Sequence, residues 1–344
     1  MKTRAAILVE QHHPLVVDEV ELPSLSLGQV LVELKTSRIC GSQIGEIDGV
    51  KGPDRYLPHL LGHEGGGIVQ EAGPGVTRVR TGDHVVLHWR PAEGLQVQAP
   101  IYRWRGRDLN AGWVTTFNQL AVVTENRLTV IPKDLDFEIA PLLADTLTTG
   151  FGIINNDARV KVGESLVIFG CGGIGLGVVL AARLAGAHPI VAVDLFDHKL
   201  IKAHEVGATH TINGRNANVS DAIREIVGQG GADVTIDGTG TPQIIEACYE
   251  LAAAKGRCIL FGVMPHDKKV TLHTLPLHHG KVLTGSEGGG SRPHLDIPRI
   301  VRMIQAGRFD PLGFISHRTK LEEINETVAK MRAGEVIHAL IHFD

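Results

Sequence analysis

Three side chains that suit a zinc ion are spread along the sequence, each in an unusual setting. His63 lies among glycines in the segment Leu61–Val69, where missing side chains let another group come close. Cys40 follows an alternating apolar segment, and Asp145 stands in an apolar run where a lone carboxylate is costly to bury. A catalytic zinc takes three such ligands and leaves its fourth position open. A histidine beside a glutamate on a loop, as at His63 and Glu64, is also often simply solvated, so the prediction depends on all three residues together.

A second motif predicts a dinucleotide site. Residues 170–175 read G-C-G-G-I-G after an apolar strand and before an apolar helix, which is the setting that the G-x-G-x-x-G pattern requires. The first glycine makes the turn, the second admits the pyrophosphate and the third lets helix and strand pack closely. A glycine-rich turn without a ligand is the alternative. The predicted cofactor-binding residues of this loop are Gly170, Gly172, Gly173, Ile174 and Gly175.

An acidic residue after the next strand indicates which dinucleotide binds. Asp194 follows Gly175 by nineteen residues, and a carboxylate there accepts hydrogen bonds from ribose hydroxyls and repels a 2′-phosphate. The sequence therefore predicts NAD rather than NADP. Lys199 could reach the same ribose, or it could be an ordinary solvated helix lysine.

Length and composition set the frame for these motifs. A chain of 344 residues favours two domains, and 43% apolar with 21% charged residues is typical of globular proteins. A net charge of −4 gives no basic surface for nucleic acid or an anionic membrane, and no apolar run is long enough to span a bilayer. Four scattered cysteines without a C-x-x-C pair suggest a reducing cytoplasm and no four-cysteine structural zinc, since using all four would consume Cys40.

The order of expected elements predicts an α/β protein. Residues 1–130 show many short strands punctuated by glycine, which indicates a β-rich, partly barrel-like domain. From about 165 onward strands and helices alternate, as in a doubly wound parallel sheet. We expect helices over 136–143, 146–155, 296–306 and 321–332, and a last strand over 336–342.

Residues 88–113 interrupt this pattern and hold all three tryptophans and several arginines. One interpretation is a surface loop that its aromatic side chains pin down. The other is a cleft wall whose planar cations bind an anionic substrate, such as a phosphorylated polyol or sugar derivative. The residues concerned are Trp89, Arg90, Arg103, Trp104, Arg105, Arg107 and Trp113.

Together these residues resemble the zinc-dependent alcohol dehydrogenase branch of the medium-chain dehydrogenase/reductase family. Gly62-His63-Glu64 with Gly67, Gly73 and Val76 fits the family's zinc signature, and Cys40-Gly41-Ser42 fits its first-ligand motif. The resemblance covers nearly the whole chain. It implies a GroES-like catalytic domain over 1–147, a Rossmann NAD-binding domain over 148–288, a return to the catalytic domain over 289–344, and a homodimer or homotetramer.

The resemblance also implies roles for single residues. Cys40, His63 and Asp145 take the three ligand positions of one catalytic zinc. Glu64 matches a residue that approaches the zinc and assists ligand exchange, and Ser42 matches the hydroxyl that accepts the substrate's proton. The residues expected to contact the nicotinamide or its carboxamide are Thr149, Gly262 and Val263.

Four departures from the family pattern stand out. The lobe that carries a structural zinc is absent, and residues 88–113 replace it. Gln43 stands where many members have Asp, which leaves the support of His63 open. Gly45 replaces the outer histidine of a proton relay, with Glu46 as the substitute candidate. His338 falls where relatives often place an arginine.

These features predict reversible NAD-dependent oxidation of an alcohol to an aldehyde or ketone, with zinc as Lewis acid and Ser42 taking the proton. A zinc-free reductase of the same fold is one alternative, although such relatives usually lack the Cys and His ligands. A non-catalytic NAD-binding protein is the other, and it would require ligands that fail to hold a metal.

Overall fold

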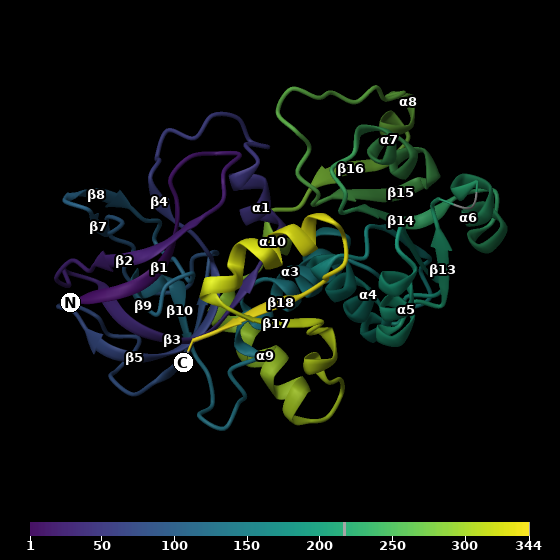
Figure 1. The fold of residues 1–344 in the computed structure, drawn as a ribbon. Coiled ribbons are helices and arrows are strands. Elements are labelled where there is room, and N and C mark those ends of the chain that lie inside the picture. The colour runs from purple at the N-terminus through teal and green to yellow at the C-terminus, as the bar shows by residue number, and fades with distance from the viewer. Residues whose placement is uncertain (216–217, 344) are drawn as a thin grey trace. The chain divides into compact units, whose positions relative to one another are not determined.

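The computed structural model describes residues 1–215 and 218–343, and its backbone contacts separate two units. The first unit contains residues 1–145 and those from 292 onward, and the second contains residues 146–291. The structure thus divides after residues 145 and 291, where the sequence placed the boundaries after 147 and 288. Figure 1 shows the return of the chain to the first unit, where the yellow C-terminal strand β18 (Ala339–His342) lies beside the purple strand β3 (Gln29–Ile39).

The first unit is rich in β-structure and includes a barrel, as the sequence predicted, and it also contains a second sheet. The strands of a closed barrel, in pairing order, are β1 (Lys2–Leu8), β2 (Val16–Glu21), β7 (Ile101–Trp104), β8 (Arg107–Asn110) and β4 (His59–Leu60). The strands of the second sheet, in pairing order, are β10 (Leu128–Val130), β6 (His84–His88), β5 (Glu64–Ala72), β3, β18 and β17 (His317–Lys320), with β9 (Leu120–Thr124) pairing with β3. Alternating inward side chains of both structures form apolar clusters that include Val32, Val85 and Tyr102.

Helices of the first unit lie between and after these strands. The α-helices are α1 (Gly41–Ile47), α2 (Ala140–Ala144), α9 (Pro293–Gln305) and α10 (Ile324–Arg332). The single-turn 3₁₀ helices are η1 (Glu125–Arg127), η4 (Pro311–Phe314) and η5 (Leu321–Glu323).

A parallel sheet forms the second unit and confirms the doubly wound prediction. Among the described residues its strands, in pairing order, are β13 (His210–Asn213), β12 (Ile190–Asp194), β11 (Leu166–Phe169), β14 (Ala232–Asp237), β15 (Ala252–Leu260) and β16 (Val282–Gly285), and each pair is parallel. The helices are α3 (Thr146–Gly152), α4 (Gly173–Ala185), α5 (Asp197–Val206), α6 (Val219–Val227), α7 (Pro242–Leu251) and α8 (Leu275–His278), with a π-helical turn η2 (Ile153–Asp157) and a 3₁₀ turn η3 (Gly288–Gly290).

Some expected element boundaries are wrong for local reasons. The helix expected from 136 begins at Ala140, because the Asp136 carboxylate accepts the Glu138 N–H at 2.9 Å and forms a turn instead. The strand expected from 336 begins at Ala339, because the backbone N–H groups of Ile337 and His338 donate to the Ser316 hydroxyl, each at 3.0 Å. The helix expected over 146–155 ends at Gly152 and continues as the π-helical turn.

The register of the second sheet brings residues from distant segments to one place. Strands β3 and β5 are antiparallel with Ser37 opposite Gly65, and β5 and β6 are antiparallel with Glu64 opposite His88. Strand β18 joins the other side of β3 with Ala339 opposite Ile39. Residues that immediately precede or follow these paired positions therefore meet at one end of the sheet.

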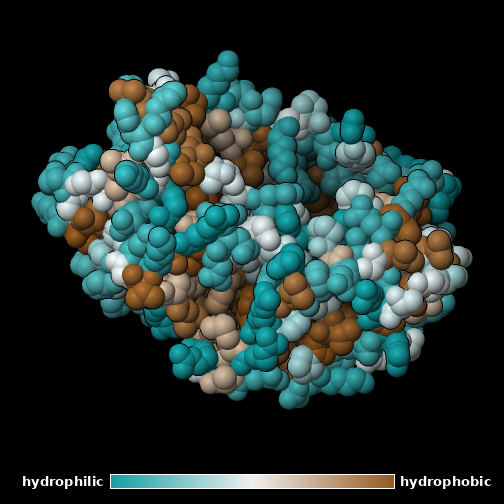
Figure 2. Space-filling model, turned by 180° about the vertical axis from the view of Figure 1, so that it is seen from behind, coloured by the Kyte–Doolittle hydropathy of each residue, from teal (hydrophilic) through white to brown (hydrophobic). Residues whose placement is uncertain are grey.

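On the face drawn in Figure 2, the surface is mostly hydrophilic, as the composition of the chain leads one to expect. Hydrophobic side chains lie in separate patches of this face (Figure 2). Among the described residues, none of the helices combines the length and the apolar character that crossing a bilayer requires.

A buried carboxylate holds part of the segment formed by residues 88–113. Glu125 is 0% exposed, and its oxygens accept the backbone N–H groups of Thr77 at 2.5 Å, Arg78 at 2.6 Å and Leu95 at 2.8 Å. The neighbouring Arg127 donates to the backbone oxygen of Trp89 and, at 2.8 Å, to the Gln96 side chain. Burial disfavours the charged form, but the backbone hydrogen bonds outweigh it and lower the pKa of Glu125.

We predict that Glu125→Gln destabilises the first unit by about 2 kcal/mol at neutral pH, because its amide group cannot accept the Leu95 N–H as the carboxylate does. Since the pKa of Glu125 is lowered in the folded state, its contribution is present above the ordinary carboxylate pKa and lost as the pH falls through the lowered value. Denaturant unfolding followed by tryptophan fluorescence measures this, because all three tryptophans lie in this unit.

The control for this prediction is Glu326→Gln, whose side chain is 67% exposed and pairs with Lys330 on the helix surface. We expect it to leave stability nearly unchanged. A difference between Glu125→Gln and the native chain that persists undiminished in strong acid would contradict the assignment.

Candidate metal and cofactor sites

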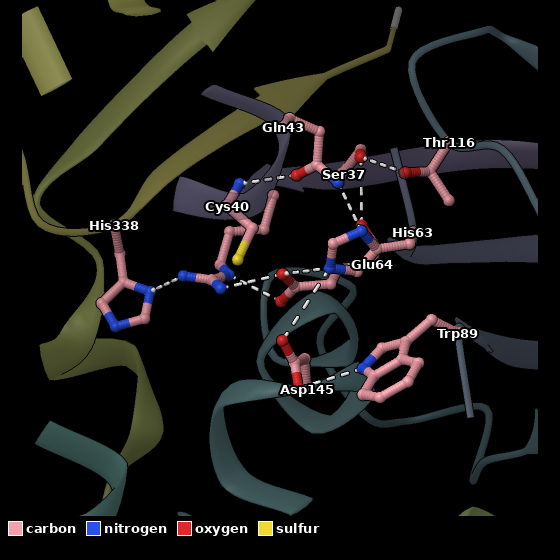
Figure 3. Close-up of polar contacts among 10 residues, drawn as sticks. Ser37, Cys40, Gln43, His63, Glu64, Trp89, Thr116, Asp145 and His338 are labelled. Atoms are coloured by element: carbon pink, nitrogen blue, oxygen red, sulfur yellow. Dashed lines mark hydrogen bonds and ion pairs between the residues drawn. The ribbon is translucent and has the colours of Figure 1, made fainter. Parts of the chain in front are cut away.

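Four side chains with metal-binding atoms converge in the first unit. One ligand atom from each of Cys40, His63, Glu64 and Asp145 lies within 4.8 Å of the other three. Figure 3 shows these side chains turned toward one another. Glu64 and Asp145 are 0% and 7% exposed, Cys40 is 8% exposed, and the His63 side chain is 17% exposed. The structure therefore brings together the three predicted ligands and Glu64 in a space largely closed to water.

Strand ends and two glycines make this convergence feasible. Cys40 directly follows β3, His63 directly precedes β5, and Asp145 lies between α2 and α3. Gly62 has φ +90°, which a residue with a side chain adopts only with strain. A Cβ atom on Gly66 would lie 2.5 Å from that of Ala140, so this glycine lets α2 pack directly on β5. The sequence predicted that some group comes close to the glycines around His63, and in the structure this group is helix α2, which leads into Asp145.

His63 contacts acidic groups on one side and an amide on the other. Its Nε2 lies 3.3 Å from Glu64 Oε1 and 3.8 Å from Asp145 Oδ2, while its Nδ1 contacts the Gln43 amide nitrogen. The Gln43 oxygen accepts the Cys40 N–H at 3.0 Å, so Gln43 connects two of the predicted ligand residues. Burial disfavours a charged ring, but hydrogen bonds with Asp145, Cys40 and Glu64 outweigh it and raise the pKa of His63 well above its usual value. A metal ion at this site must therefore compete with a proton.

A buried arginine pairs with Glu64, and sequence reasoning missed it. Arg38 Nε donates to Glu64 Oε2 at 2.6 Å and Nη2 to Oε1 at 2.8 Å, with side chains 2% and 0% exposed. Its third nitrogen, Nη1, lies 3.0 Å from His338 Nδ1. Burial opposes the charge, but Glu64 and Cys40 outweigh it and raise the pKa of Arg38, which stays protonated. His338 thus contacts an arginine that β3 supplies.

Trp89 reaches the third predicted ligand, which the sequence did not reveal. Its indole Nε1 donates to Asp145 Oδ1 at 3.1 Å, and the other carboxylate oxygen faces His63 (Figure 3). The indole thereby occupies one oxygen of Asp145 and leaves Oδ2 for the cluster. The signal available in the sequence was an aromatic residue directly after a strand, which is too common to be informative.

The hydroxyl of Ser42 lies two residues from Cys40, in the first turn of α1. Its Oγ is buried, and no other group among the described residues makes a hydrogen bond with it. A buried hydroxyl without a partner is costly unless a ligand supplies one.

Three arginines in residues 88–113 already have carboxylate or aromatic partners within the protein. Arg103 pairs with Asp108, and Arg105 pairs with Asp18 at 2.8 Å. Arg105 and Arg107 both stack on the Trp104 ring, at 4.7 and 4.6 Å from its centroid. These contacts favour the interpretation of a pinned surface segment over that of an anion-binding wall.

The glycine loop of the second unit has the geometry that a dinucleotide needs. Gly170 has φ +95° and makes the turn after β11, and α4 begins at Gly173 and includes Ile174. A Cβ on Gly175 would lie 2.0 Å from the Gly170 carbonyl oxygen, whereas one on Gly172 would meet no atom within 4 Å. The open space at Gly172 lies at the helix N-terminus, where free N–H groups favour an anion.

The other predicted cofactor residues lie in the same unit. Asp194 ends β12 and accepts the Cys171 N–H at 2.8 Å, which fixes its carboxylate beside the glycine loop. Lys199 stacks on the Phe196 ring at 4.8 Å. Thr149 is buried in α3, and Gly262 and Val263 follow β15, with Val263 57% exposed.

Family models match two long segments of the chain. Residues 26–133 match the alcohol dehydrogenase GroES-like domain family, and residues 173–306 match the zinc-binding dehydrogenase family. The S-(hydroxymethyl)glutathione dehydrogenase of Paracoccus denitrificans is 32% identical over 99% of this chain and 100% of its own length. The class-3 alcohol dehydrogenase of Cereibacter sphaeroides is 33% identical over the full length of both chains.

Solved structures show the same similarity. An alcohol dehydrogenase zinc-binding domain protein from Burkholderia ambifaria has a TM-score of 0.91 at 28% identity, covering 100% of this chain and 99% of the other. Benzyl alcohol dehydrogenase from Acinetobacter calcoaceticus has a TM-score of 0.90 at 26% identity over both full chains. The chain therefore belongs to the zinc-dependent alcohol dehydrogenases of the medium-chain dehydrogenase/reductase family. It is an NAD-dependent oxidoreductase with a GroES-like and a Rossmann part, as predicted.

We predict that Trp89→Phe weakens zinc binding by about tenfold, because Asp145 loses the donor that orients it while the aromatic ring is kept. Competition with a chromophoric chelator measures the affinity. Trp113→Phe is the matched control, since Trp113 is 45% exposed and stacks only on Arg127 in the contacts described. Equal affinities of the native chain and Trp89→Phe would show that the hydrogen bond does not orient the ligand.

A pair of loop variants separates folding from NAD binding. Gly172→Ala should keep the thermal midpoint and weaken NAD binding by about tenfold or more, equivalent to about 1.4 kcal/mol, because its methyl group fills ligand space. Gly175→Ala should lower the thermal midpoint as well, because its methyl group meets the Gly170 carbonyl. Calorimetry measures both quantities, and unimpaired NAD binding by Gly172→Ala would place the cofactor elsewhere.

Proposed function

We propose that this protein oxidises an alcohol to an aldehyde or ketone, reversibly and with NAD, at a single catalytic zinc held by Cys40, His63 and Asp145. The convergence of these three side chains and Glu64 within 4.8 Å carries the proposal. One thiolate, one imidazole and one carboxylate form a donor set that suits zinc. When bound, zinc supplies a Lewis acid that lowers the pKa of an alcohol and stabilises negative charge on its oxygen.

The side chains of the site have distinct tasks in this proposal. Ser42 accepts the substrate's proton, which its buried and otherwise unbonded hydroxyl supports. Glu64 supplies negative charge beside the ligand atoms and assists exchange of the fourth ligand. Gln43 and Trp89 orient His63 and Asp145.

The second unit binds NAD in this proposal. The glycine loop receives the pyrophosphate, and Asp194 and Lys199 receive the adenosine ribose. Thr149, Gly262 and Val263 meet the nicotinamide end. The positions of Gly170, Gly172 and Asp194 around the start of α4 support this assignment.

The substrate class is proposed from chemistry and similarity. A neutral alcohol fits better than a phosphorylated polyol, because the arginines at 103, 105 and 107 are occupied by carboxylates or by Trp104. We also propose a cytoplasmic homodimer or homotetramer. The free cysteines and the thiolate ligand suit a reducing compartment, and the assembly follows from the family resemblance.

The test is NAD reduction by zinc-loaded and metal-free protein with a panel of alcohols. The panel holds simple alcohols, polyols, sugar phosphates, benzyl alcohol and S-(hydroxymethyl)glutathione, the last two taken from the names of relatives. We expect activity that requires zinc and disappears in Asp145→Ala, while Asp134→Ala, an exposed site, stays active. Full turnover by metal-free protein would refute the proposal in favour of a zinc-free reductase, and zinc binding without turnover of any alcohol would favour a non-catalytic protein.

A further inference from the structure

Glu64 is placed where it could act as a fourth metal ligand. Its carboxylate oxygen lies within 4.8 Å of the ligand atoms of Cys40, His63 and Asp145, and Oε1 is 3.3 Å from His63 Nε2. Four protein ligands close a zinc site, whereas three leave a position for substrate. Something in the chain must therefore keep Glu64 from completing the set.

Arg38 has the geometry for that task. Its Nε and Nη2 donate to the two oxygens of Glu64 at 2.6 and 2.8 Å, so the guanidinium engages both atoms that could bind a metal. Arginine only donates hydrogen bonds, so His338 Nδ1 accepts from the remaining Nη1 at 3.0 Å and holds the guanidinium from behind. Strand β3 anchors Arg38 between β5, which begins with Glu64, and β18, which follows His338.

Charge balance supports the same conclusion. The cluster contains the acidic groups of Cys40, Glu64 and Asp145, and the cation Arg38 with a divalent ion would neutralise all three. A buried carboxylate that loses its cation must find another partner or take up a proton. With Arg38 removed, the nearest alternative cation for Glu64 is the metal itself.

We propose that Arg38 is a positioning residue that prevents Glu64 from becoming a permanent fourth ligand of the metal and so keeps one coordination position open for substrate. This inference rests on the proposed zinc site. If Arg38 only stabilised the fold, its loss would weaken metal binding together with everything else. If it acts as proposed, its loss tightens metal binding while it closes the site.

The experiment uses the cobalt-substituted protein, with imidazole as a probe of an open coordination position. In the native chain, added imidazole should shift the visible absorption bands of cobalt. In Arg38→Met the bands should no longer respond, zinc should be held about 10- to 100-fold more tightly in chelator competition, and turnover should fall. In the double variant Arg38→Met/Glu64→Gln, which has no carboxylate to bind the metal, the imidazole response should return.

The matched control is Arg318→Met, which removes a bidentate arginine–glutamate pair with Glu138 on the surface, where the Arg318 side chain is 55% exposed. It should behave like the native chain. If Arg38→Met does not fold, His338→Leu, which removes only the acceptor behind the guanidinium, should show a reduced imidazole response.

Three results decide the matter. Weaker zinc binding and an unchanged imidazole response in Arg38→Met, or an unchanged response in His338→Leu if the first variant does not fold, overturn the proposal and leave Arg38 as structural support. A native chain that takes up neither zinc nor cobalt refutes the proposed function instead. Tighter zinc binding with a closed site, reversed by Glu64→Gln, establishes the proposal.

Discussion

The buried ion pair between Arg38 and Glu64 is the interaction around which the proposed metal site is organised. It neutralises a carboxylate that stands, 0% exposed, beside a thiol and a second carboxylate. Burial of several like charges is affordable only when each has a partner. The pair leaves Cys40 and Asp145 as the acidic groups that a divalent ion would balance. The architecture of the first unit can be understood as the means by which these charges are brought together and kept apart from water.

The pairing register of the strands brings these charged side chains together, although they come from distant segments of the chain. Ser37 stands opposite Gly65 and Glu64 opposite His88, so side chains separated by tens of residues emerge at the same end of three neighbouring strands. The C-terminal segment adds His338 from the far side of β3. Glycines then let α2 approach β5 closely enough to bring in Asp145. The segment formed by residues 88–113 takes part too, because Arg127 donates to the backbone oxygen of Trp89, whose indole donates to Asp145.

What the sequence could predict depended on local patterns with a physical meaning. The glycines that flank His63 and those of the loop at Gly170 indicated places where other groups approach the backbone closely. The alternation of strands and helices predicted the parallel sheet. Arg38 was not predictable, because an arginine in an apolar strand says nothing about its partner until the register with Glu64 is known. Trp89 was not predictable either, because an aromatic residue directly after a strand is too common to indicate a partner. The helix boundary at Ala140 was misplaced because the Asp136 turn competes with a helix that composition alone favours.

The central claim is that the Cys40 sulfur, a ring nitrogen of His63 and a carboxylate oxygen of Asp145 bind one zinc ion. X-ray absorption at the zinc edge of the zinc-loaded protein tests it most directly, because it counts the neighbours of the metal by element and distance. The structure predicts one sulfur at about 2.3 Å, with the remaining neighbours nitrogen or oxygen at about 2.0–2.2 Å. A first shell without sulfur, or with more than one, would contradict the assignment of Cys40, His63 and Asp145 as the ligands.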